Sequence, residues 1–225
     1  MAVQADSDRS SRMAVIDSIK AALGMKSVIH DAALAGVATP GAPGTPLPVQ
    51  GRPDLSTVDL FEEVLLDYRA TVRRCEENQV ANVIAELFSD QDISSVVVPR
   101  GLDSRWYARL GGIDLTVDDG ARPAVELASI DAVITGCACA IAETGTIVLS
   151  CQPDEGRRAI TLLPDFHFCV VKSEVIIRHV KDLFKHVSIA NPITLISGPS
   201  ATSDIELKRV EGVHGPRHLF VIIVS

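Results

Sequence analysis

Four residues near the middle of the chain, Glu143-Thr144-Gly145-Thr146, have the composition of a chemical site. They separate two short apolar runs whose small and β-branched side chains predict buried strands. A carboxylate at such a junction is costly to bury, so Glu143 is a candidate nucleophile or general base. The alternative is a tight turn, in which Gly145 supplies a permissive backbone and Glu143 points into water.

A second polar segment, Ser197 to Asp204, directly follows an apolar strand-like run. In a parallel sheet this segment lies at the carboxyl end of the strand, where α/β proteins bind their ligands. Gly198, Ser200 and Thr202 could present backbone N–H groups to a phosphate or a carboxylate. The alternative is a helix N-cap at Thr202 or Ser203 without any ligand.

Two histidines and an arginine add groups that can exchange protons or bind anions. His214 and Arg217 lie between chain-bending residues just before the last apolar run. An imidazole suits general acid–base catalysis, and a guanidinium suits a carboxylate. His167 has apolar neighbours and is either a core histidine or a pocket residue; a structural role is also open for His214. If the loops meet at one sheet edge, Glu143, Ser200 and His214 line a common cleft.

The elements that must position these residues begin near residue 57, where helix-period and strand-like segments alternate. This alternation predicts an α/β fold with a mostly parallel central sheet flanked by helices. Helices are expected at 58–67, 77–88, 103–110 and 174–186. Strands are expected at 69–74, 94–98, 113–117, 131–135, 139–142, 146–150, 168–171, 192–196 and 218–224.

The first quarter of the chain has a different composition. Apolar residues at helical spacing predict an amphipathic helix over 12–23, and Gly and Pro dominate residues 35–53. We therefore expect a helical arm at 1–34, a linker at 35–56 and an α/β domain at 57–225.

Composition excludes several classes of function. The 225 residues are 47% apolar, which is enough for one large core, and the formal charge of −8 argues against binding nucleic acid. No apolar run approaches the ~20 residues that span a bilayer, and the chain begins polar, so a cytoplasmic protein without a membrane span is expected. The five cysteines include no CxxC pair, so neither a metal site nor a cluster is expected in this chain.

Four motifs, in this order, resemble the LUD-domain family, and within it the lactate-utilisation C type. The resemblance covers roughly residues 57 to 225. The motifs are Ile141-Ala-Glu-Thr-Gly-Thr-Ile-Val-Leu149, Leu162-Leu-Pro-Asp-Phe-His167, Ile196-Ser-Gly-Pro-Ser-Ala-Thr-Ser-Asp-Ile-Glu206 and Gly212-Val-His-Gly-Pro-Arg217.

The resemblance implies a fold similar to the ribose-phosphate isomerase and coenzyme A transferase superfamily. It also implies a part in oxidising L-lactate to pyruvate with two partner proteins, one of which carries iron–sulfur clusters that this chain does not hold. Glu143, Ser200, Thr202, His214 and Arg217 would then line a pocket for a small carboxylate or an anionic cofactor. Two alternatives stay open: a free-standing coenzyme A transferase-like or acyl-transfer enzyme that uses Glu143 as nucleophile, and a non-catalytic ligand-sensing or scaffold module.

Overall fold

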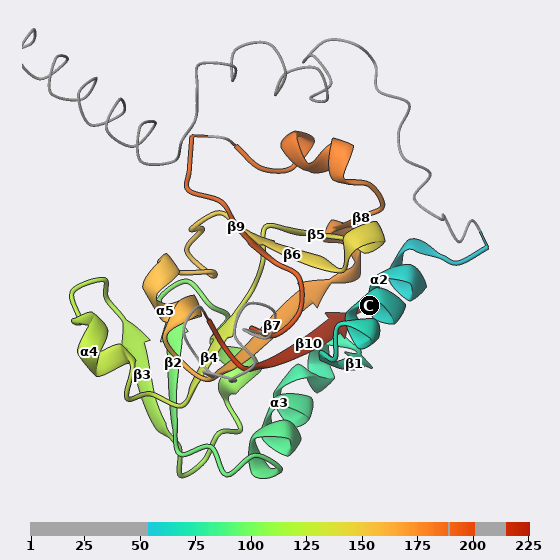
Figure 1. The fold of residues 1–225 in the computed structure, drawn as a ribbon. Coiled ribbons are helices and arrows are strands. Elements are labelled where there is room, and N and C mark those ends of the chain that lie inside the picture. Colours follow the sequence, from blue (N-terminus) through green and yellow to red (C-terminus); the bar gives the residue numbers. More distant parts are fainter. Residues whose placement is uncertain (1–53, 189, 201–214) are drawn as a thin grey trace, which may run out of the picture. The chain divides into compact units, whose positions relative to one another are not determined.

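The computed structural model describes residues 54–188, 190–200 and 215–225, and its centre is a six-stranded sheet (Figure 1). Every neighbouring pair in this sheet is parallel, which confirms the predicted α/β fold with a parallel central sheet. In spatial order the strands are β1 (Thr71–Cys75), β10 (His218–Val224), β7 (Phe166–Lys172), β4 (Ala132–Thr135), β2 (Ser95–Pro99) and β3 (Asp114–Asp118).

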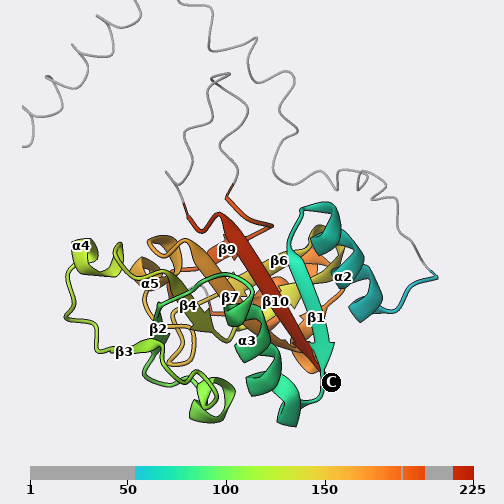
Figure 2. The same cartoon turned by 90° about the horizontal axis from the view of Figure 1, so that it is seen from below.

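Layers on both faces bury the central strands, which explains their unbroken apolar runs. Alternate residues of β10 face opposite layers: Phe220 and Ile222 pack with α3 (Val80–Ser89), which follows the 3-10 turn η1 (Glu77–Gln79). Val221 and Ile223 pack instead with α2 (Thr57–Asp67) and with a second sheet. Figure 2 shows α3 across one face of the strands.

The second sheet has four strands in the order β8 (Ile176–Ile177), β5 (Cys139–Ile141), β6 (Thr146–Leu149) and β9 (Thr194–Ile196). β5 and β6 form an antiparallel hairpin, and η3 (Ala142–Thr144) is its turn.

The position of β9 corrects one expectation. β9 pairs antiparallel with β6, so the segment that begins at Ser197 does not follow a strand of the parallel sheet. An apolar β-branched run predicts a strand, but it does not specify which sheet the strand joins.

The helix predictions were correct for α2 and for η1 with α3, and less so elsewhere. The expected helix at 103–110 is the short η2 (Ser104–Tyr107). The expected helix at 174–186 is broken into η4 (Ser173–Val175), β8 and η5 (Val180–Lys185), because Ile176 pairs with Ala140 of β5. Two short helices were not predicted, α4 (Ala124–Leu127) and α5 (Arg158–Leu162).

Several predictions lie outside the described residues. They are the helix at 12–23, the Gly- and Pro-rich segment at 35–53, Thr202 and His214. No helix within the described ranges is long and apolar enough to cross a membrane.

Candidate functional site

The turn between β5 and β6 and the loop after β9 are joined by hydroxyl groups. Thr144 Oγ1 lies 2.7 Å from Thr146 Oγ1, which lies 2.8 Å from Ser197 Oγ. The antiparallel pairing of β6 with β9 brings these residues together from positions 51 apart in sequence. Two of the sequence motifs are therefore in direct contact.

The glycines of these two motifs pack on the same residue, Tyr68, which is the C-cap of α2. Gly145 has φ +56°, and a Cβ there would lie 2.8 Å from Val64 Cγ1 and 3.4 Å from Tyr68 Cδ2. Gly198 has φ +87°, and its Cβ would lie 2.8 Å from Tyr68 Cβ. Both positions require glycine for backbone conformation and for space. Gly145 and Gly198 therefore serve packing against α2.

Glu143 has close partners in the segment after β8. Its Oε1 accepts a hydrogen bond of 2.7 Å from the Val180 amide, and its Oε2 lies 2.8 Å from His179 Nδ1. Partial burial acts to raise the pKa of Glu143, but these two contacts outweigh it and the pKa is lowered. The group is an ionised carboxylate that holds the start of η5 against the β5–β6 turn.

Three of the residues that the sequence predicts for a ligand site line a cavity of about 320 Å³, called here the motif cavity. His167, Gly198 and Ser200 line it, together with Arg158 and Thr161 of α5. It lies toward the amino ends of β7 and β10, where the Ser200 amide donates a hydrogen bond of 2.8 Å to the Pro216 carbonyl. Glu143, Thr144, Gly145 and Arg217 are not among its described lining residues.

His167 is fully buried in β7, and its Nε2 lies 2.8 Å from Thr135 Oγ1. Burial lowers the pKa of His167 to about 4, so the imidazole is neutral near pH 7. Within the described structure its Nδ1 has no hydrogen-bond partner. Both sequence interpretations hold for His167, because it is a core histidine and also part of a cavity wall.

Arg217 is paired with a carboxylate of the protein. Its Nε and Nη2 donate to the two carboxylate oxygens of Asp165, a bidentate arrangement. Asp165 belongs to the Leu-Pro-Asp-Phe-His motif, so this ion pair joins two further motifs. Binding of an external carboxylate by Arg217 would have to displace Asp165.

The opposite edge of the central sheet, formed by the carboxyl ends of its strands, carries a site that the sequence did not indicate. The chain leaves β2 toward β3 and leaves the adjacent β4 toward β7, in opposite directions. Such a topological switch point is where open α/β sheets bind ligands. The segment 151–156 crosses it: the Gly101 amide donates to the Pro153 carbonyl at 2.9 Å and the Gly136 amide to the Asp154 carbonyl at 3.0 Å.

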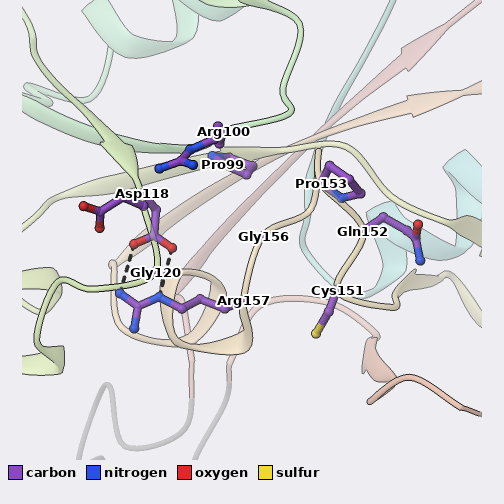
Figure 3. A pocket seen from close by; sticks show the side chains of 10 residues that line it. Pro99, Arg100, Asp118, Gly120, Cys151, Gln152, Pro153, Gly156 and Arg157 are labelled. Atoms are coloured by element: carbon purple, nitrogen blue, oxygen red, sulfur yellow. Dashed lines mark hydrogen bonds and ion pairs between the residues drawn. The ribbon is translucent and has the colours of Figure 1, made fainter.

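A cavity of about 320 Å³ lies beside this segment, at the carboxyl ends of β2 and β3. We call it the switch-point cavity (Figure 3). Asp118, whose side chain is only 4% exposed, accepts two hydrogen bonds of 2.9 Å from Nε and Nη2 of Arg157. The residues that line the cavity are Pro99, Arg100, Asp118, Asp119, Gly120, Cys151, Gln152, Pro153, Gly156 and Arg157.

A buried carboxylate shapes the segment over the switch point. Glu155 Oε2 accepts hydrogen bonds from the amides of Ser150 and Gln152, at 2.5 and 3.0 Å. Burial raises the pKa of Glu155, although these bonds oppose the shift. Glu155 thus folds the chain into the tight bend that includes Cys151, whose φ is +58°.

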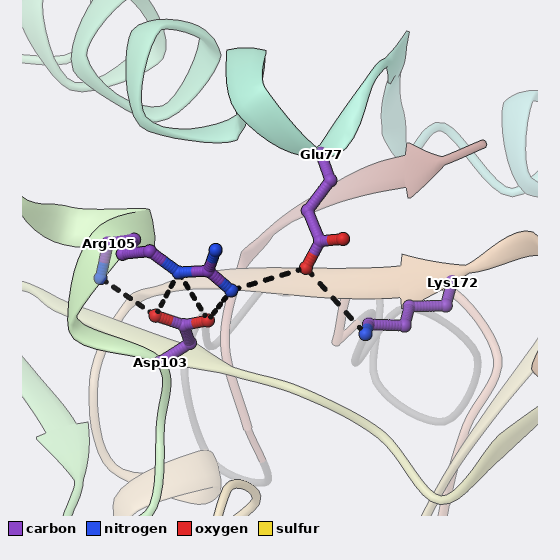
Figure 4. Close-up of polar contacts among 4 residues, drawn as sticks. All are labelled: Glu77, Asp103, Arg105 and Lys172. Atoms are coloured by element: carbon purple, nitrogen blue, oxygen red, sulfur yellow. Dashed lines mark hydrogen bonds and ion pairs between the residues drawn. The ribbon is translucent and has the colours of Figure 1, made fainter.

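The charged side chains of Figure 4 connect the segments after β1 and β2 with the end of β7, at the same edge of the sheet. Arg105, after β2, pairs with Asp103 at 2.6 Å and reaches Glu77, after β1, at 3.6 Å. Lys172, at the end of β7, lies 3.7 Å from Glu77. The pairs are largely exposed, so they add little to the free energy of unfolding.

Cys137 and Cys139, which follow β4, disfavour the thiolate form that binds metal ions. The neighbouring Cys169 thiol, together with burial, raises the pKa of Cys137 well above its usual value. Burial and Glu155 raise the pKa of Cys139 to about 11. Among the residues described, no group of three or more His, Cys, Asp or Glu side chains is placed to hold a metal ion.

Comparisons with known proteins connect this architecture to a family. The family model for the LUD domain matches residues 58–224. Lactate utilization protein C of Deinococcus radiodurans is 41% identical over 200 residues, which cover 86% of this chain and 91% of that protein. Lactate utilization protein C of Bacillus subtilis is 39% identical over 94 residues, 38% of each chain. The crystal structure of a DUF162 family protein from Deinococcus radiodurans superposes with a TM-score of 0.65 at 36% identity, covering 76% of this chain and 99% of that one.

Proposed function

The chain belongs to the LUD domain family, and on that premise we propose that it acts in lactate utilization. One observation carries the proposal: 41% identity to lactate utilization protein C of Deinococcus radiodurans across 86% of this chain.

In finer detail, we propose that the chain is a cytoplasmic subunit of a system that oxidises L-lactate to pyruvate. Converting the hydroxyl to a ketone removes two electrons and two protons. The proposal assigns those electrons to iron–sulfur clusters in one of two partner proteins. In this proposal the chain is the subunit that binds the ligand, and a partner protein carries the electrons.

The geometry gives less support to acyl transfer. That reaction needs Glu143 to attack a substrate carbonyl, whereas both of its oxygens already have partners in His179 and Val180. Its lowered pKa also makes the carboxylate a weaker nucleophile.

Deletion of the gene in its own organism tests the proposal. We expect growth on L-lactate to be lost, growth on pyruvate to be kept, and the gene supplied in trans to restore lactate growth. Normal growth of the deletion strain on L-lactate would overturn the proposed function.

A tagged chain tests the finer proposal. Purification from lactate-grown cells should recover two further proteins, with iron and acid-labile sulfide in the assembly. Recovery of the chain alone, under conditions in which the tagged gene restores lactate growth, would argue against the complex.

A further inference from the structure

We propose that the switch-point cavity binds a 2-hydroxycarboxylate, with Arg100 pairing with the carboxylate and Asp119 accepting a hydrogen bond from the hydroxyl group. This inference deepens the proposed function in lactate utilization and rests on it. It concerns binding alone, because oxidation needs an electron acceptor that the proposal places in a partner.

The position of the cavity is the first argument. It lies at the carboxyl ends of β2 and β3, beside the switch point between β2 and β4. Its volume of about 320 Å³ is at the lower end of the range for small-molecule sites. Cys151 and Gln152 are exposed at its rim, so a small solute has access from solvent.

The charges of the cavity are the second argument. Two of its four charged side chains, Asp118 and Arg157, neutralise each other in a bidentate pair. Arg157 also donates a hydrogen bond of 2.7 Å to the Arg122 carbonyl, which fixes the pair in place. The Asp118–Arg157 pair is therefore a fixed part of the cavity wall. Arg100 and Asp119 are the two charged lining residues that can contact a ligand.

Arg100 and Asp119 have the complementary chemistry. In the described part of the chain the Arg100 guanidinium makes no hydrogen bond and no ion pair within 4 Å, and its charge acts on Asp119 only from a longer distance. Figure 3 shows Arg100 on the same side of the cavity as Asp118. Asp119 uses one oxygen to accept a 2.9 Å hydrogen bond from the Ala121 amide and keeps further acceptor capacity. That bond and the nearby Arg100 lower the pKa of Asp119, so it is an ionised, acceptor-only group.

This pairing discriminates between a hydroxy acid and a keto acid. Arg100 accepts the carboxylate of either one, as a guanidinium does. The Asp119 carboxylate can only accept a hydrogen bond, so it favours the hydroxyl group of lactate. The keto oxygen of pyruvate is also an acceptor only and cannot donate to Asp119. Asp119 is exposed, so the preference for lactate comes from repulsion between its carboxylate and the keto oxygen of pyruvate. Pro99 and Pro153 supply an apolar wall for the small alkyl group.

Titration calorimetry of the purified full chain with L-lactate and with pyruvate tests the inference. We expect saturable binding of L-lactate that is at least ~10-fold tighter than that of pyruvate. Arg100→Met should weaken both by ~10-fold or more, because the carboxylate loses its partner. Asp119→Asn should reduce the preference for lactate, because its amide can donate to the keto oxygen.

Arg158→Met is the matched control, since Arg158 is an exposed arginine that lines the motif cavity instead. It should leave lactate binding unchanged, and thermal unfolding should show that all three variants are folded. Absence of saturable lactate binding by the full chain, or loss of binding in Arg158→Met but not in Arg100→Met, would overturn the inference. Growth of the deletion strain on lactate is measured separately, so this inference can fail while the proposed function stands.

Discussion

Glu143 and His179 are 36 positions apart in the chain, and Oε2 of the first lies 2.8 Å from Nδ1 of the second. The contact ties the β5–β6 turn to the segment that leads into η5. It gives the most conspicuous carboxylate of the sequence a positioning role within the fold.

Glu143→Gln should therefore reduce stability. The amide keeps the shape and one acceptor, but it loses the charge that faces the Val180 amide and His179. We expect a loss of about 1–3 kcal/mol in the free energy of unfolding at pH 7, measured by urea denaturation. The pKa of Glu143 is lowered in the folded state. The difference in free energy of unfolding between wild type and variant should therefore be complete above the ordinary glutamate pKa, and it should disappear as pH falls through the folded-state pKa.

Glu174→Gln is the control for this change, since Glu174 is exposed in the same part of the chain. A Glu143→Gln protein with wild-type stability and no lactate-dependent growth would instead make Glu143 catalytic.

His167 should make the stability of the wild-type protein depend on pH. Its pKa of about 4 in the folded chain lies below the ordinary 6.5, so the unfolded chain binds the extra proton between these values. Stability from this group is complete above about pH 6.5 and falls toward pH 4, by on the order of 3 kcal/mol. His167→Gln should flatten that part of the curve of urea midpoint against pH, while substitution of the exposed His186 should not.

Gly145 and Gly198, which pack against Tyr68, should not tolerate replacement by alanine. Gly145→Ala and Gly198→Ala each place a Cβ 2.8 Å from another carbon atom at a positive φ, so each should lower the free energy of unfolding by about 1–3 kcal/mol. Gly111→Ala is the control, since a Cβ there has no atom within 4 Å. Equal thermal midpoints for all three variants would show that this packing does not matter.

The isolated chain should be colourless. The raised pKa values of Cys137 and Cys139 disfavour the thiolates that bind iron. We expect no stoichiometric iron after incubation with ferrous iron and sulfide, measured by metal analysis and visible absorption. An absorbing cluster in this chain alone would contradict the assignment of clusters to a partner.

The sequence by itself determined most of the strands. Runs such as Val96-Val97-Val98 and the last seven residues before Ser225 indicated buried strands, because β-branched apolar residues suit a sheet covered on both faces. The ordered motifs likewise indicated the family. These are local signals, carried by composition and order along the chain.

Only the tertiary structure decided how the motifs are used. The composition of an apolar run does not specify which strand it pairs with. The pairing of β9 with β6 was therefore not predictable, and neither was the position of the loop that begins at Ser197. The partner of Glu143 is 36 residues away and was missed for the same reason. The switch-point cavity combines side chains from loops after β2, β3 and β6, which come together because a parallel sheet aligns the carboxyl ends of strands that are distant in sequence.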